Sequence, residues 1–179
     1  MLTADSILDF NFNEFIDRHV LEDSLVSLLL LKDEQKFTNQ RLKYLNSEQE
    51  ISIFGLKNSK RGENYNYRQI VFHARKFDDN SDEEKIILPK KVLNICPDLD
   101  IIYNYEDIHL YIFNRSIYGL LEDEKISKLN SIKVDFIPYL INNHFNLKLR
   151  RLVAQQRRTE KPESSLKITG LILDEKNYA

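Results

Sequence analysis

Asp107 and His109 are residue types that can exchange a proton, and their spacing brings them together if the segment is a strand. They lie in the run Asp-Ile-His-Leu-Tyr-Ile-Phe, whose apolar character predicts a strand over residues 109–113. Side chains two positions apart in a strand point to the same face, and a carboxylate beside an imidazole shifts its protonation. The sequence favours the simpler interpretation, in which His109 is a hydrogen-bonded histidine of the core or of a sheet edge.

The other reactive residue types do not form a recognisable site. His19, His73 and His144 are far apart in the sequence and lack the spacing of metal ligands on one helix. Cys96 is the single cysteine, so it excludes an internal disulfide and offers no metal-binding pair. We interpret Cys96 as a small buried residue that ends a helix before Pro97, in preference to a reactive thiol. From these residues we expect no catalytic group, no metal site and no cofactor.

The elements that must position these residues alternate along the chain, which predicts an α/β fold. Asn11 or Asn13 can cap the first helix, and Pro89 suits the first position of another, where its missing amide costs nothing. Helices are expected over residues 11–21, 89–96, 115–122, 133–142 and 147–158, and strands over residues 24–31, 51–56, 67–74, 86–88, 99–103, 109–113 and 165–173.

Composition indicates a single soluble unit in the cytosol. The chain has 179 residues, of which 42% are hydrophobic, and its 26 basic residues nearly balance 28 acidic ones, so no overall field attracts nucleic acid. The longest apolar run, residues 25–31, is too short to cross a membrane. An acidic block at residues 78–84 and a basic run of Lys148, Arg150, Arg151, Arg157 and Arg158 are interpreted as solvated surface in preference to a binding patch.

Two ends of the sequence carry a specific resemblance. Ile137-Pro138-Tyr139-Leu140 precedes His144-Phe145 after a buried strand and a helix, and near the N-terminus Asp5 and Asp9 stand four residues apart before a helix and an apolar strand. These motifs resemble those of the gamma-subunit family of eukaryotic translation initiation factor 2B, and the resemblance extends over residues 4–145. The resemblance implies a Rossmann-like, nucleotidyltransferase-type mixed sheet flanked by helices and incomplete at its N-terminus. Residues 1–145 would be a partial domain of this type, and residues 146–179 a basic helix and a poorly ordered tail.

The resemblance also suggests which residues could have a chemical role. Asp5 falls where active nucleotidyltransferases hold Mg²⁺ with a carboxylate, but a glycine-rich phosphate loop is missing, because the four glycines Gly55, Gly62, Gly119 and Gly170 are scattered. Asp5 is therefore a vestigial metal candidate, and we favour the interpretation that Asp5 and Asp9 cap the following turn and helix. Asp135 is interpreted as a helix cap near Pro138.

The function implied by the resemblance is that of a non-catalytic subunit. Such a chain would support an epsilon-type catalytic subunit in the guanine-nucleotide exchange factor for translation initiation factor 2, without contacting membrane or nucleic acid. Its partners would be the other subunits of factor 2B and initiation factor 2 itself, bound through aromatic anchors among Tyr103, Tyr105, Tyr111, Phe136 and Tyr139. The alternatives are a sugar-phosphate nucleotidyltransferase using Mg²⁺ and a nucleoside triphosphate, and a fragment without a function of its own.

Overall fold

The structure is a computed structural model, and it describes residues 11–32, 50–57, 66–77, 86–103, 105–157 and 166–173. The helices are α1 (Phe12–Leu21), α2 (Lys90–Ile95), α3 (Tyr118–Leu121), α4 (Ile137–Asn142) and α5 (Leu147–Arg157). The strands are β1 (Val26–Lys32), β2 (Glu50–Lys57), β3 (Tyr67–Phe77), β4 (Leu99–Ile102), β5 (Tyr105–Phe113) and β6 (Ile168–Leu173). Three tighter or wider helical turns lie between β5 and α4, namely η2 (Arg115–Ile117), η3 (Ile126–Lys128) and η4 (Ile132–Phe136).

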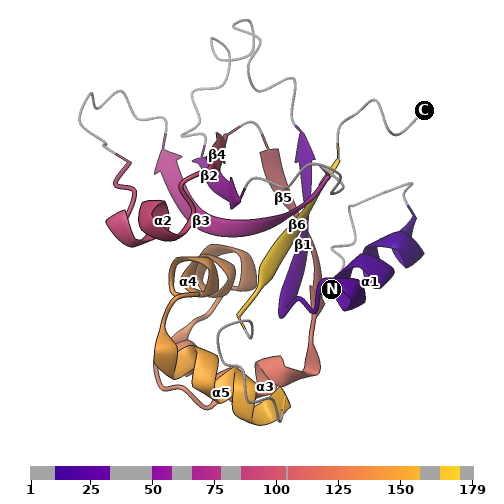
Figure 1. Ribbon diagram of the computed structural model, residues 1–179, viewed down its shortest axis with the longest axis vertical. Helices are drawn as coiled ribbons and strands as arrows, with labels where there is room; N and C mark the ends of the chain where they lie inside the picture. The colour runs from indigo at the N-terminus through magenta and orange to yellow at the C-terminus, as the bar shows by residue number, and fades with distance from the viewer. Residues whose placement is uncertain are drawn as a thin grey trace, which may run out of the picture.

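The strands form one six-stranded mixed sheet in the order β4-β2-β3-β6-β1-β5 (Figure 1). Only β1 and β6 run parallel, and every other neighbouring pair is antiparallel. The strand β3 follows β2 along its length but pairs with β6 only over Tyr67–Gln69, so it joins the two halves of the sheet. The expectation of an α/β fold with a mixed sheet flanked by helices is confirmed at this level.

The strand β6 corrects one expectation from the sequence. The strand expected over residues 165–173 is confirmed as β6, but it was expected within a poorly ordered tail, whereas all six of its residues are buried in the middle of the sheet. Its register with β1 runs from Val26 opposite Ile168 to Leu31 opposite Leu173. The physical reason is its nearly continuous apolar sequence, which suits a strand covered on both faces. Gly170 fits there because an added Cβ would lie 3.0 Å from Cδ1 of Ile70.

Helices cover both faces of the β1–β6 pair. On one face, Leu28 and Leu30 of β1 join Leu140 and Ile141 of α4 in the largest core cluster. On the other face, Leu29 of β1 packs with residues that include Phe15 of α1. Figure 1 shows α1 on one side of these strands and α3, α4 and α5 on the other. The smaller helix α2 closes a separate apolar cluster, in which Cys96 is buried as predicted.

The helix boundaries follow local capping with a few departures. Asn11 caps α1, with its Oδ1 3.1 Å from the backbone nitrogen of Asn13. The helix expected at 115–122 is divided into η2 and α3, and the one expected at 133–142 begins with the wide turn η4. The short strand expected at 86–88 is wrong, because these residues join no strand and leave Ile86 and Ile87 exposed before Pro89. Among the described residues, no helix is long and apolar enough to cross a membrane.

Candidate functional site

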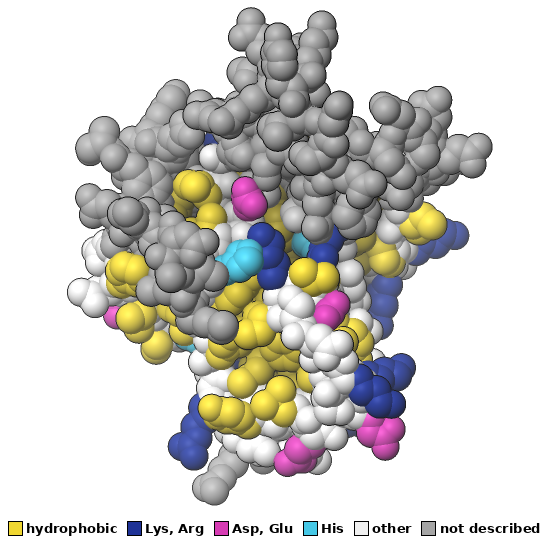
Figure 2. Space-filling view, turned by 180° about the vertical axis from the view of Figure 1, so that it is seen from behind, with side chains coloured by type: hydrophobic (Ala, Val, Ile, Leu, Met, Phe, Trp, Pro, Cys, Tyr) yellow, Lys and Arg dark blue, Asp and Glu magenta, His cyan; other side chains and the backbone are white. Residues whose placement is uncertain are grey.

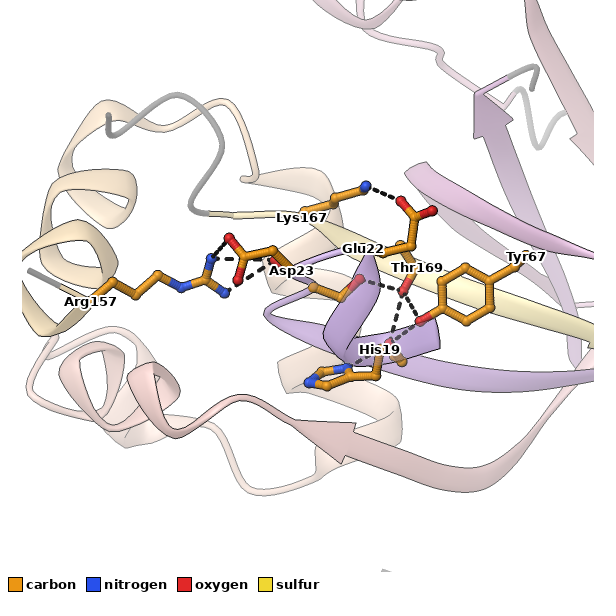
Figure 3. A network of polar contacts seen from close by, with 9 residues as sticks. His19, Glu22, Asp23, Tyr67, Arg157, Lys167 and Thr169 are labelled. Atoms are coloured by element: carbon orange, nitrogen blue, oxygen red, sulfur yellow. Dashed lines mark hydrogen bonds and ion pairs between the residues drawn. The ribbon is translucent and has the colours of Figure 1, made fainter. Parts of the chain in front are cut away.

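Beneath α1 the sheet buries a cluster of hydroxyl groups around a histidine (Figure 3). We call it the hydroxyl cluster, and it consists of Ser24, Ser27, Tyr67 and Thr169 together with His19. His19 comes from the last turns of α1, Ser24 from the turn that follows it and Ser27 from β1, while Tyr67 and Thr169 come from β3 and β6. All five residues are at least nine-tenths buried. The cluster therefore joins four segments at one end of the parallel strand pair.

Ser27 is at the centre of these contacts. Its Oγ lies 2.7 Å from Nδ1 of His19, 2.6 Å from the Tyr67 hydroxyl and 2.9 Å from Oγ1 of Thr169. Thr169 Oγ1 also lies 2.9 Å from Ser24 Oγ and donates to the Tyr67 hydroxyl at 2.8 Å. Ser27, Tyr67 and Thr169 thus close a ring of hydroxyl groups, in which each can donate to the next.

The number of hydrogens available in the cluster determines which ring nitrogen of His19 carries a proton. The five contacts require five hydrogens, whereas the four hydroxyl groups provide one each. All five contacts are satisfied only if Nδ1 of His19 donates to Ser27, which leaves the lone pair of a neutral imidazole on Nε2. Burial lowers the pKa of His19, and the nearby Arg157 lowers it further, with Asp23 acting in the opposite direction. His19 is therefore neutral near pH 7.

This arrangement argues against nucleophilic catalysis at Ser27. A serine beside a histidine could be a nucleophile with its base, but the base would have to accept the serine proton. Here Nδ1 is the donor, and Ser27 is completely buried beneath α1. Burial also raises the pKa of Tyr67, against the opposing hydrogen bonds from the other hydroxyl groups. What the hydroxyl cluster does is to fix α1 and β6 against β1.

Two ion pairs extend the cluster toward the surface, as Figure 3 shows. Nη1 of Arg157 lies 2.7 Å from Oδ2 of Asp23, and Lys167 pairs with Glu22. Asp23 has a φ of 47°, in the left-handed region, which aspartate tolerates better than most residues. The two pairs tie the turn after α1 to the end of α5 and to the start of β6. The basic residue Arg157 thus has a structural partner.

Asp107 and His109 do not form the pair that simple strand alternation predicts. Asp107 lies opposite Leu30 and Tyr111 opposite Leu28, so β5 carries two extra residues in a bulge. His109 is in the bulge with a φ of 63°. The Asp107 carboxylate accepts from the backbone nitrogen of His109 at 2.9 Å and from the Tyr111 hydroxyl at 2.6 Å. Burial raises the pKa of Asp107, and these two hydrogen bonds oppose the shift. Asp107 therefore stabilises the bulge.

The two remaining histidines, His73 and His144, are also buried. Burial lowers the pKa of His73 and of His144 to about 4 in each case. His144 places Nδ1 2.5 Å from the carbonyl oxygen of Ile141, and its Nε2 has no hydrogen-bond partner in the described structure. Asn142 accepts from the backbone nitrogen of His73 at 3.1 Å and donates to its carbonyl oxygen at 2.9 Å. This two-way contact attaches α4 to β3.

Other residues singled out in the sequence have structural roles or lie outside the described residues. Asp5, Asp9 and Arg158 are in the latter group. Asp135 accepts from the backbone nitrogen of Ser131 at 3.0 Å, while Ser131 itself caps the turn, so Asp135 is architectural as predicted but is not the cap. Tyr111 is buried, and its hydroxyl donates a hydrogen bond to Asp107, so it does not lie on the surface where an aromatic anchor for a partner would have to be.

An apolar hollow of about 240 Å³ lies beside the edge strand β5. Leu121, Ile132 and Phe136 are among its lining residues, together with Phe113 of the strand itself. The rings of Phe113 and Phe136 are 6.4 Å apart between centroids. A broad hydrophobic area is visible on the face of the molecule shown in Figure 2. Hydrophobic hollows of this kind can accept side chains of another protein.

The sequence did not indicate the hydroxyl cluster. The available signal was the presence of Ser27 and Thr169 within two otherwise apolar strands, where a hydroxyl group needs a partner if both faces are covered. Among the described residues, no group of three or more possible ligands converges on a metal position. Neither a model of a known family nor a curated protein matches this chain.

Proposed function

We propose that this chain is a non-catalytic, protein-binding subunit of the kind that its sequence resembles, the gamma subunit of translation initiation factor 2B. In this proposal it works in the cytosol within the guanine-nucleotide exchange factor for translation initiation factor 2, and it supports an epsilon-type catalytic subunit. In this proposal, residues 1–145 would correspond to the C-terminal part of a Rossmann-like, nucleotidyltransferase-type domain, and β6 would join the sheet from outside the region of the resemblance.

The observation that carries the proposal is the position of the segment with the resemblance. Ile137, Leu140 and Ile141 are buried in the main core, and Asn142 pairs with the backbone of His73. Pro138 stands in the first turn of α4, where its missing amide is tolerated. These residues are buried, hydrogen-bonded or suited to the first turn of a helix. The segment that carries the resemblance therefore determines how α4 packs against the sheet.

The apolar hollow beside β5 supports a role in protein contact. Phe136, one of the expected aromatic anchors, lines it, and Tyr103 is exposed nearby in the sequence before β5. Leu121 also lines the hollow and is 49% exposed, which gives a partner a hydrophobic side chain to cover. By contrast, the polar residues of the hydroxyl cluster are already paired inside the fold.

The test is binding to an epsilon-type subunit of the same organism. Purified chain and epsilon-type subunit should form a complex in size-exclusion chromatography with light scattering. Leu121→Glu should weaken the complex at least about tenfold, because a charge placed in an apolar contact must be desolvated. Leu147→Glu is the matched control, since Leu147 is 61% exposed at the start of α5 and lies outside the hollow.

Two outcomes would reject the proposal. Failure of the wild-type chain to bind any subunit of the exchange factor would remove its basis. Release of pyrophosphate from a nucleoside triphosphate and a sugar phosphate with Mg²⁺, abolished by Asp5→Ala, would instead favour the nucleotidyltransferase alternative.

A further inference from the structure

A second, polar hollow lies between the end of α5 and the turn that leads into α3. It has a volume of about 530 Å³, within the range of small-molecule sites. Its lining includes Asn114, Arg115 and Tyr118 from the segment after β5 and Gln156 and Arg157 from α5. It contains no residue of the hydroxyl cluster and none of the apolar hollow.

Local hydrogen bonds occupy the side-chain oxygen of Asn114 and leave its amide hydrogens as donors. Oδ1 of Asn114 accepts from the backbone nitrogen of Ser116 at 3.0 Å and from its hydroxyl at 2.8 Å. Oγ of Ser116 in turn accepts from Nε of Arg157 at 3.1 Å. Within the described structure, the amide NH₂ of Asn114 and the guanidinium of Arg115 have no hydrogen-bond or ion-pair partner. The unused groups of Asn114 and Arg115 are thus N–H donors.

Gln156, which forms one side of the polar hollow, packs closely against Gly119. Gly119 is buried against α5, and a Cβ at that position would overlap Cγ of Gln156 and lie 3.1 Å from the carbonyl oxygen of Leu152. The absent side chain lets the stem of Gln156 cross Gly119 and place its amide at the hollow. The site is therefore shaped by the contact between α3 and α5.

The charge of the polar hollow is positive. Arg157 is neutralised by Asp23, with 2.7 Å between Nη1 and Oδ2, whereas Arg115 has no carboxylate partner among the described residues. The described residues that line the hollow include no carboxylate. A guanidinium and amide donors around one space are suited to an oxyanion with several acceptor oxygens.

We propose that the polar hollow binds the phosphate group of a phosphorylated small molecule. Arg115 and the Asn114 amide bind the phosphate oxygens, and the volume left beside Tyr118 accommodates the rest of the ligand. A carboxylate is a weaker fit, because it offers two acceptor oxygens where a phosphate offers more. This inference does not depend on the proposed function, since it concerns a different surface and is measured on the chain alone.

The test uses inorganic phosphate as the probe, followed by NMR chemical shifts of the labelled chain at constant ionic strength. Phosphate should shift signals of residues 114–118 and 155–157 in a saturable way. Arg115→Ala should weaken binding about tenfold, the usual loss for one charge-assisted hydrogen bond. Arg151→Ala is the matched control, because Arg151 is an exposed arginine of α5 outside the hollow and should leave binding unchanged.

A second variant separates binding from folding. Asn114→Asp keeps the oxygen that accepts from Ser116 but replaces the NH₂ donor by a negative oxygen, so the turn should persist while phosphate binding is lost. Its thermal transition should match that of the wild type. The proposal is overturned if phosphate causes no saturable shift, if Arg115→Ala and Arg151→Ala behave alike, or if acetate binds more tightly than phosphate.

Discussion

The two faces of the β1–β6 pair are held by different kinds of contact. The face toward α4 is apolar, with Leu28, Leu30 and Leu140 packed in the largest core cluster. The face toward α1 combines apolar residues such as Phe15 and Leu29 with the hydroxyl cluster, in which Ser27 and Thr169 are directly opposite each other in the parallel register. Apolar packing contributes most of the stability, whereas a buried polar network requires one arrangement in which its groups are paired.

The difference between the two faces of the β1–β6 pair indicates that each face has a separate role. A slip of two residues between β1 and β6 would keep every side chain on its own face, but it would separate Ser27 from Thr169 and leave hydroxyl groups buried without partners. The apolar face would penalise the same slip less, because neighbouring side chains there are also large and hydrophobic. We infer that the α4 face supplies stability and that the α1 face specifies register.

The largest expected effect of a single substitution comes from opening the apolar face. Leu140 is completely buried in α4, so Leu140→Ala should lower the free energy of unfolding by about 3 kcal/mol through lost burial and a cavity. Urea unfolding followed by circular dichroism measures this change. A loss below that of Ser27→Ala would contradict the assignment of stability to the α4 face.

Acid should destabilise the protein through its buried histidines. The folded-state pKa values of His73 and His144 are about 4, below the ordinary value of 6.5, so the unfolded chain binds more protons between these limits. Their contribution is present above pH 6.5 and is lost as the pH falls toward 4. Lowering the pH from 7 to 5 should cost about 2 kcal/mol per histidine, measured by urea unfolding at both values. NMR titration of both rings near pH 6.5 would contradict this prediction.

Breaking the hydroxyl cluster should have a smaller effect on stability but a distinct effect on order. Ser27→Ala removes three contacts and leaves His19 Nδ1 without its acceptor, which should cost about 1.5 kcal/mol. Amide hydrogen exchange should then accelerate in α1 and β6 more than in α4. Equal acceleration in all three elements would show that the cluster does not specify register.

The smallest expected effect concerns the ion pair at the edge of the cluster. Asp23→Asn retains a residue that tolerates the positive φ but removes the charge that faces Arg157, so it should cost about 0.5 kcal/mol. The difference from wild type should shrink in 1 M salt because screening weakens the original pair. Thermal unfolding at low and high salt measures it, and a difference that does not depend on salt would indicate a backbone effect instead.

Local signals allowed much of this fold to be predicted from the sequence. Asn11 caps α1 through its own neighbours, and the apolar runs of β1, β2 and β3 mark strands wherever they occur in the chain. The place of β6 could not be predicted in this way, because strand character does not say which strand will be the neighbour. The bulge at His109 was hidden for a related reason, since the extra residues show only against the register of β1.

The candidate sites depended still more on distant contacts. Ser27 and Thr169 are 142 positions apart, and nothing near either residue in the sequence indicates the other. Asp107 was found as a candidate, but its partners proved to be a backbone nitrogen and the hydroxyl of Tyr111. Composition and spacing identify groups that can react, whereas only the packing decides whether those groups are available.

The central position of β6 has a consequence for biosynthesis. A ribosome makes β1, β3 and every helix of the described structure before it makes β6, so the edges of β1 and β3 that β6 will join stay uncovered during most of translation. Contacts between residues so far apart in the chain also form slowly. Until β6 is synthesised, the nascent chain therefore exposes two strand edges whose unpaired backbone groups favour aggregation. A chaperone would be most useful to it during this interval.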